Sequence, residues 1–533
     1  MKTIISKIST AALAACLCMS FPACSDFLDE HPNGQLNKEN YFNNKEELNA
    51  SLHALYSIIA TSQASNNYIG TNFLAGDDIS THPASNKQSL REFDQYNVAD
   101  NNTWMATLWE QRFKVIKAAN FIINNAGRTQ NVSQEDIHAA IAQARYWRAY
   151  SYFYLVTTWG KVPVMLEEKI DYNAPLETEE RIYELIVEDL KFAEKNLPVL
   201  YTEAPFGRNG INIAVSEGAA KATLSYVYMC MAGWPLNKGN EYYKLAADKA
   251  EEVIDAADKH TYYYKLLDEY KQVYSIAYNY NNPEVLLGIY YNRDRTPNSI
   301  PLTDIPLDVI QNGWGDTNGE IKFWKEFPEG PRKDATYMPK IILADGKLHD
   351  WWDDPSNQRE VVAPIFMKTV ESATRGQDFD YKDPTALPAN GEKTVQVIRL
   401  SQVYCWFAEA TARQGLVTQK AVDMLNRVRN RADGKKTNLY TTGMEANDLA
   451  EAAYNEHGWE MAGYYWAGFA TRARDMFRMY RFKDHFEYRK NNPEIEVTTG
   501  IKRKEKVSVT GAWDDSKMYA PYPYEDAILN PNL

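Results

Sequence analysis

Aromatic side chains alternate with short polar ones in the part of the chain that has the fewest signs of regular structure. Trp314 lies among amides and carboxylates, and Trp351 and Trp352 are flanked by aspartates. Flat aromatic rings stack on the apolar C–H faces of sugars, while Asp, Asn and Gln side chains hydrogen-bond to the hydroxyl groups around those faces. This combination predicts a site that holds a carbohydrate by stacking and by polar contacts at its edges.

The candidate glycan-binding residues share an aromatic ring on a predicted loop, or a carboxylate close to one. They are Trp314, Trp351, Trp352, Trp324, Tyr68, Tyr278, Tyr280, Asp77 and Asp316. Trp314 is the central prediction, because amides and carboxylates flank it on both sides. For Trp324 and Trp351 an alternative stays open, in which the ring only pins its loop to the body of the protein. Tryptophans on helical patterns, such as Trp147 and Trp406, are expected in the core.

Catalytic chemistry has weaker support in the sequence. A glycoside hydrolase needs two carboxylates about 5 to 10 Å apart, and 71 Asp and Glu residues supply such pairs by chance. The sequence has no HExxH pair, Walker loop, nucleophile elbow or Cys–His signature, so we expect no cofactor and no metal. The acidic run 350–354 leaves calcium open, although its spacing does not match an EF-hand. A secreted helical hydrolase and a peptide-binding adaptor remain as alternatives to a glycan-binding protein.

The elements that must position these residues are helices, which follow one another from about residue 40 to 290. Ser133 begins a long helix with a capping-box-like pattern, and Gly160 ends it. Thr178 opens another helix, whose apolar residues recur at helical spacing.

Two segments have the pattern of paired helices of tetratricopeptide type, at 216–254 and at 401–428. Small alanines at the contact positions allow two helices to approach closely. Between about 291 and 395 the helical period fades, and Gly, Pro, Asp and Asn alternate with aromatic residues. We therefore predict an all-α fold, in which helix pairs are wrapped by long loops that carry the function.

The charge and the cysteines exclude some partners. The formal net charge is −13 at pH 7, and such an acidic surface repels nucleic-acid phosphates. We expect no nucleic-acid partner. Cys230 and Cys405 lie on apolar helical patterns, where a free cysteine behaves as a small buried hydrophobe. A disulfide between them stays open at this stage.

The N-terminus has the layout of an export signal. Lys2 and Lys7 form a basic region, an apolar run follows, and small residues lead to Cys24. This run is too short to span a bilayer, and an acidic polar segment follows it. We expect residues 1–23 to be a lipoprotein signal peptide and Cys24 to be the site of lipid attachment. The alternative is an ordinary secretory signal that contains cysteines by chance.

Several motifs follow one another in order along the chain. A Cys followed by D-F-L-D-x-x-P lies at 24–32, and an A-R-Y-W-R-A-Y helix that leads to W-G-K-V-P lies at 144–163. A G-W-G loop at 313–315, an R-L helix at 399–410 and an N-P-N-L ending at 530–533 follow. In this order the motifs resemble those of the SusD/RagB family of outer-membrane nutrient-binding lipoproteins, and the segment at 144–163 is the most specific similarity.

The resemblance implies a role that the residues alone do not specify. It implies a lipid-anchored protein, exposed at the surface of the outer membrane, that captures an oligosaccharide and delivers it to a SusC-like TonB-dependent transporter. It also implies a division into a signal peptide at 1–23, an N-terminal helical region at 24–290 and a C-terminal region at 291–533, with the last two forming one compact body.

Overall fold

The computed structural model describes residues 41–63, 75–169, 171–298, 300–464 and 468–533. Its described part consists mainly of α-helices, with strands only in short two-stranded pairs, and this confirms the predicted all-α class. In that part, no helix is long and apolar enough to cross a bilayer.

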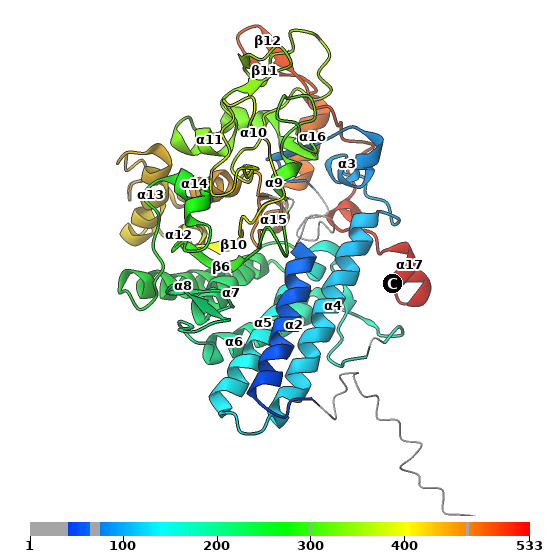
Figure 1. The fold of residues 1–533 in the computed structure, drawn as a ribbon, viewed down its shortest axis with the longest axis vertical. Helices are drawn as coiled ribbons and strands as arrows, with labels where there is room; N and C mark the ends of the chain where they lie inside the picture. Colours follow the sequence, from blue (N-terminus) through cyan, green and yellow to red (C-terminus); the bar gives the residue numbers. More distant parts are fainter. Residues whose placement is uncertain (1–40, 64–74, 170, 299, 465–467) are drawn as a thin grey trace, which may run out of the picture.

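Four long helices pack side by side at the N-terminal end, in the lower part of Figure 1. They are α2 (Lys45–Gln63), α4 (Thr103–Asn125), α5 (Gln134–Trp159) and α6 (Glu179–Asn196).

Side-chain caps fix where two of these helices begin. The Ser133 hydroxyl accepts a hydrogen bond from the Asp136 backbone N–H at 3.0 Å, and the Thr178 hydroxyl accepts one from Arg181 at 3.2 Å. Each cap satisfies an N–H group that the first turn of a helix leaves without a partner. Both predicted helix starts are therefore confirmed, as is the end of α5 at Gly160, which has a positive φ of 70°.

The two predicted helix pairs are also confirmed. The first pair is α7 (Glu217–Ala232) with α8 (Asn240–Asp258), and the second is α12 (Leu400–Arg413) with α13 (Gln419–Asp433). β6 (Val285–Ile289) pairs antiparallel with β10 (Val395–Arg399), so that the two halves of the chain are joined across the predicted boundary at residue 290.

Apart from one helix of 16 residues, α14 (Ala446–Met461), the remaining elements are short and lie mostly in the C-terminal half. The helices are α3 (Gln88–Asp94), α9 (Ile300–Thr303), α10 (Ile321–Glu326), α11 (Pro331–Thr336), α14 (Ala446–Met461), α15 (Arg472–Arg478), α16 (Phe482–Asn491) and α17 (Tyr524–Leu529). The 3₁₀ turns are η2 (Ser85–Lys87), η3 (Ala126–Arg128), η4 (Tyr270–Tyr274), η5 (Ile276–Tyr278) and η6 (Asp515–Met518). The strands are β1 (Ile79–Thr81), β2 (Val162–Pro163), β3 (Leu176–Glu177), β4 (Gly207–Arg208), β5 (Ile211–Asn212), β7 (Thr317–Gly319), β8 (Ile341–Ile342), β9 (Leu348–His349), β11 (Ile495–Thr498) and β12 (Ile501–Arg503).

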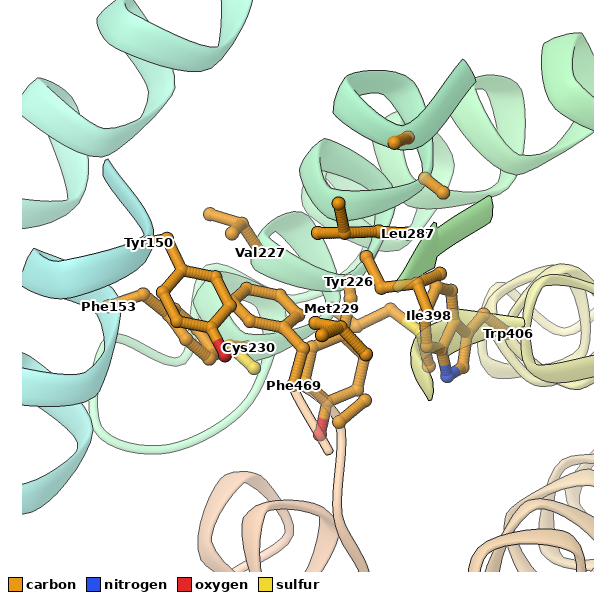
Figure 2. Close-up of a cluster of buried hydrophobic side chains, with 14 of the residues drawn as sticks. Tyr150, Phe153, Tyr226, Val227, Met229, Cys230, Leu287, Ile398, Trp406 and Phe469 are labelled. Carbon is orange, nitrogen blue, oxygen red and sulfur yellow. The ribbon is translucent and has the colours of Figure 1, made fainter. Parts of the chain in front are cut away.

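The main core lies where α5, α7, β6, β10 and α12 meet. Figure 2 shows Tyr150 and Phe153 from α5 facing Phe469, and the Phe153 and Phe469 rings lie 4.4 Å apart. Trp147 and Trp406 are both buried, as expected from their helical patterns. Cys230 and Cys405 are buried free thiols, which settles the open question of their pairing.

A buried cluster of charges ties the C-terminal helices together. We call it the Glu460 cluster; it consists of Glu284, Arg332, Arg399, Arg431 and Glu460. The Glu460 carboxylate lies 3.0 Å from Arg399 and 3.2 Å from Arg332, and it also pairs with Arg431. Buried charges of opposite sign satisfy one another, but removing one of them leaves the others without a counter-ion.

Candidate functional site

A short antiparallel ribbon brings together two loop regions that lie more than 200 residues apart in the sequence. β1 pairs with β7 in the register Ile79↔Gly319 and Thr81↔Thr317. The predicted site residues Trp314 and Asp316 therefore lie at one end of the ribbon, and Asp77 lies at the other. The sequence did not predict this pairing, because each strand has only three residues.

Trp314 is held by a tightly folded loop that precedes β7. Its backbone N–H donates to the Leu302 carbonyl at 2.8 Å, and the next residue, Gly315, donates to the Ile305 carbonyl at 2.8 Å. A Cβ on Gly313 would lie 2.5 Å from the same Ile305 oxygen, so that only glycine fits there. The loop fixes the backbone of Trp314 while its ring is only half-buried, which leaves part of the ring accessible to a ligand.

The same loop presents apolar side chains that sequence reasoning missed. Leu307 is 55% exposed and Ile310 is 40% exposed, and both precede Trp314 on the loop. Asn312 is exposed as well and supplies an amide. Their signal in the sequence was weak, because single apolar residues are common on protein surfaces.

Asp316 does not fit its predicted role. Its side chain is buried and forms an ion pair with Lys87, so its oxygens are engaged within the protein. The prediction that Asp316 contacts a ligand is wrong for this reason. Asp316 instead fastens the loop that carries Trp314 to the segment after β1.

Asp77 is likewise engaged within the protein. Its two oxygens accept hydrogen bonds from the Arg472 guanidinium at 2.6 and 2.8 Å. Burial alone would raise the pKa of Asp77, but the Arg472 charge holds it below its usual value. Burial and the neighbouring Asp77 charge raise the pKa of Asp78 to about 6, and Asp78 accepts a hydrogen bond from the Gly463 N–H at 2.9 Å. The pairing with Arg472 gives Asp77 a structural role, and because its side chain is still 17% exposed, its role as a ligand contact stays a prediction.

Trp324, Trp351 and Trp352 pack on one another as a separate cluster beside the β11–β12 hairpin. Their ring centroids lie 5.1 to 5.6 Å apart with steeply inclined planes. Trp351 is 1% exposed, so its ring cannot stack on a sugar, and its prediction as a ligand contact is wrong.

The other two rings of this cluster are half-buried. The Lys333 ammonium lies 4.1 Å from the centroid of the Trp324 ring and covers one of its faces. The Arg503 guanidinium donates to the Trp352 backbone carbonyl at 2.8 Å. The main role of this cluster is therefore to anchor its loop. Of its three tryptophans, only Trp324 and Trp352 expose some ring surface.

Tyr278 and Tyr280 are both half-buried. The Tyr280 hydroxyl donates to the Tyr291 carbonyl at 2.7 Å, and the Tyr290 ring stacks 6.5 Å from the Tyr280 ring. Arg208 covers the Tyr280 ring at 5.2 Å. Sequence reasoning missed Arg208, because it lies on a distant strand. Tyr68 and Cys24 lie outside the described residues, so their roles stay predictions.

The acidic run 350–354 forms contacts within the protein. Asp350 pairs with Lys340 at 2.6 Å, and Asp354 accepts hydrogen bonds from the backbone N–H groups of Gln358 and Arg359. Among the residues that the structure describes, no three His, Cys, Asp or Glu side chains converge on a point where they could hold a metal ion.

The fold defines the class of protein as a helical body of tetratricopeptide-like pairs with long loop insertions. Two family models match its two ends. One, described as starch-binding and associating with the outer membrane, covers residues 26–229, and the other, described as the SusD family, covers residues 375–533. The chain belongs to the SusD/RagB family.

Known relatives extend over nearly the whole chain. A SusD-like protein of Bacteroides ovatus is 25% identical over 585 residues, covering 100% of this chain and 97% of its own length. The structure of a SusD homologue from Bacteroides thetaiotaomicron has a TM-score of 0.76 at 20% identity, over 93% of this chain and 97% of that one. A laminarin-binding SusD-like protein has a TM-score of 0.69 at 20% identity, over 92% and 98%.

Proposed function

We propose that this protein binds an oligosaccharide on the loop face that carries Trp314. The observation that carries the proposal is the half-buried Trp314 ring, whose backbone is fixed by two hydrogen bonds, from Trp314 N–H to the Leu302 carbonyl and from Gly315 N–H to the Ile305 carbonyl. Such a ring offers a flat apolar surface that does not have to be ordered when a sugar binds, so little conformational entropy is lost. Leu307 and Ile310 add apolar surface, and Asn312 adds an amide.

The family and its relatives support this proposal. One family model is described as starch-binding, and one solved structure of this fold is that of a laminarin-binding protein. Of the predicted contacts, Trp314 remains the central one, and the half-buried rings of Trp352, Trp324, Tyr278 and Tyr280 are secondary candidates.

The transporter and the membrane enter as further parts of the proposal. Cys24 would carry the lipid that holds the protein at the outer face of the outer membrane, and a SusC-like TonB-dependent transporter would receive the glycan. We propose that residues 24–290 and 291–533 act as one body. The β6–β10 pair and the Glu460 cluster, which both join the two regions, support this view.

The protein is proposed to bind its glycan without cleaving it. Of the carboxylates that a hydrolase could use, Asp77 is held in an ion pair with Arg472, and the neighbouring Asp78 is buried and accepts a hydrogen bond from the Gly463 N–H. Both carboxylates are therefore engaged in contacts within the protein, which supports binding without cleavage.

Calorimetry with the purified 25–533 protein tests this function against a panel of neutral polysaccharides that includes laminarin. We expect binding of at least one of them, with no release of reducing ends during prolonged incubation. Release of reducing ends would show that the protein is a glycoside hydrolase and would refute the proposal. Binding of oligopeptides in the absence of any glycan binding would replace it by a peptide adaptor.

A further inference from the structure

A groove that Trp314 does not line lies on the side of the molecule where α11 and α13 are seen in Figure 1. It is a groove of about 1100 Å³ between η4, α11, the C-terminal end of α13 and residues 367–379. We call it the α11–α13 groove. Neither Trp314 nor Trp352, Tyr278 or Tyr280 lines it. Its volume is large enough for a ligand of several sugar rings.

The floor of the groove holds a buried amine without an acidic partner. Lys368 is 3% exposed, and its Nζ donates to the Tyr270 hydroxyl at 3.4 Å and to the Glu460 backbone carbonyl at 3.5 Å. The Tyr274 ring lies 5.0 Å from the same Nζ. Within the described residues, no carboxylate oxygen lies within 4.0 Å of this amine, because three arginines already occupy the Glu460 carboxylate.

A second lysine lies beside the first. Lys393 also lines the groove, and its Nζ donates to the backbone carbonyls of Lys368 at 3.2 Å and Val370 at 2.6 Å. It forms no ion pair with a described carboxylate. Burial lowers the pKa of Lys393 to about 8 and that of Lys368 well below its usual value, since no carboxylate in contact offsets their desolvation.

The rim adds two exposed cations. Lys435 and Lys436 follow Gly434, the left-handed residue that ends α13, and neither pairs with a described carboxylate.

The acidic groups of the groove lie at its rim and are exposed, and two of the four are already occupied. Glu269 pairs with Lys271 at 2.9 Å, and Asp378 accepts hydrogen bonds at 2.7 Å from the Ser275 hydroxyl and the Ile276 N–H. Asp268 and Asp334 complete the set. The groove therefore combines two buried amines on its floor with two exposed lysines on its rim, although the net charge of the whole protein is −13.

We propose that the α11–α13 groove is a second binding site, which takes a saccharide that carries carboxylate groups. A ligand carboxylate would supply the counter-ion that Lys368 and Lys393 lack, and Lys435 and Lys436 would face a further carboxylate along the sugar chain. Charge-assisted hydrogen bonds of this kind are stronger than those between neutral groups. The site extends the proposed glycan binding to uronic acids, but it does not depend on Trp314.

Calorimetry at low salt tests the groove with trigalacturonate and trimannuronate, each compared with its uncharged methyl ester. We expect at least one of the free acids to bind and its ester to bind at least tenfold more weakly. Lys435→Ser/Lys436→Ser changes only exposed side chains, and it should weaken binding of the acid at least fivefold. The matched control is Lys504→Ser/Lys506→Ser, which removes the same charge from exposed lysines outside the groove and should change nothing.

A variant of the floor tests the deeper part of the site. Lys368→Met removes the amine but keeps a long side chain, and it should weaken binding of the acid at least tenfold. Trp314→Ala should leave that binding unchanged, so the groove and the Trp314 site can fail separately. The proposal is overturned if neither free acid binds, if acid and ester bind equally well, or if the rim variant binds as tightly as its control.

Discussion

Replacing Trp351 by alanine distinguishes an anchoring ring from a binding ring. Trp351 is 1% exposed and is enclosed by Trp324 and Trp352, with Ile321 and Val362 completing the cluster. Its Nε1 has no hydrogen-bond partner among the described residues, so the substitution removes packing and no hydrogen bond. Trp351→Ala should therefore destabilise the loop and the β11–β12 hairpin that pack around this ring.

The size of the effect follows from the burial. Deletion of a buried tryptophan side chain costs about 3 to 5 kcal/mol. We expect about 3 kcal/mol, since the half-buried Trp324 and Trp352 can move into part of the space. That free energy corresponds to an increase of roughly 150-fold in the population of the locally open state.

Hydrogen exchange read by mass spectrometry measures this opening. Peptides from 345–362 and 495–503 should lose about two orders of magnitude in protection, whereas peptides from α5 should not change. Trp352→Ala is the matched variant and should cost about 1 kcal/mol, since its ring is only half-buried. Glycan affinity of the folded Trp351→Ala protein should fall much less than that of Trp314→Ala, because the two rings that move, Trp324 and Trp352, are only secondary candidates. Unchanged protection together with lost glycan binding would refute the anchoring role.

Three further substitutions test the charges and the anchor. Glu460→Gln should destabilise the protein by about 3 to 5 kcal/mol at pH 7. Burial opposes ionisation of Glu460, but three arginines lower its pKa to about 2. Chemical denaturation should therefore show that the difference in unfolding free energy between wild type and variant shrinks as the pH falls from 4.5 towards 2. The pKa of Asp78 is raised to about 6, so the stability of the wild type falls as the pH rises from 4 to 6. Asp78→Asn should therefore have a higher melting temperature than the wild type at pH 8 and the same one near pH 4. A lower melting temperature of the variant at pH 8 would contradict this pH dependence. Cys24→Ala should release the protein from membranes in a fractionation assay while glycan binding persists; membrane retention would disprove lipid attachment at this residue.

The helices could be predicted from the sequence, because their signals are local. Ser133 and Thr178 cap helices that begin one residue later, and the apolar spacing of 216–254 and 401–428 gave two real helix pairs. The tryptophans of the helical patterns were also placed correctly, since Trp147 and Trp406 are buried.

The site was less predictable, because it depends on contacts between distant segments. Asp77 and Asp316 are of a residue type that often contacts sugars, but they form ion pairs with Arg472 and Lys87. No local sequence pattern predicts ion pairs between residues so far apart. Trp351 has polar neighbours in the sequence and apolar ones in space.

The α11–α13 groove was hidden for the same reason. Its floor joins Lys368 with Tyr270 and Tyr274, which come from a segment almost 100 residues earlier. A lysine in a loop segment is expected to be solvated, and only the folded structure shows Lys368 buried without an acidic partner.

The affinity of the Trp314→Ala variant for the polysaccharide that binds the wild type tests the central claim most directly. Trp513→Ala is the control, because Trp513 is also half-buried and lies on a different segment. We predict that Trp314→Ala weakens binding at least tenfold, about 1.4 kcal/mol, in a protein that stays folded, and that the control binds as the wild type does. An unchanged affinity in the folded Trp314→Ala protein would contradict the account and remove the Trp314 loop from the binding site.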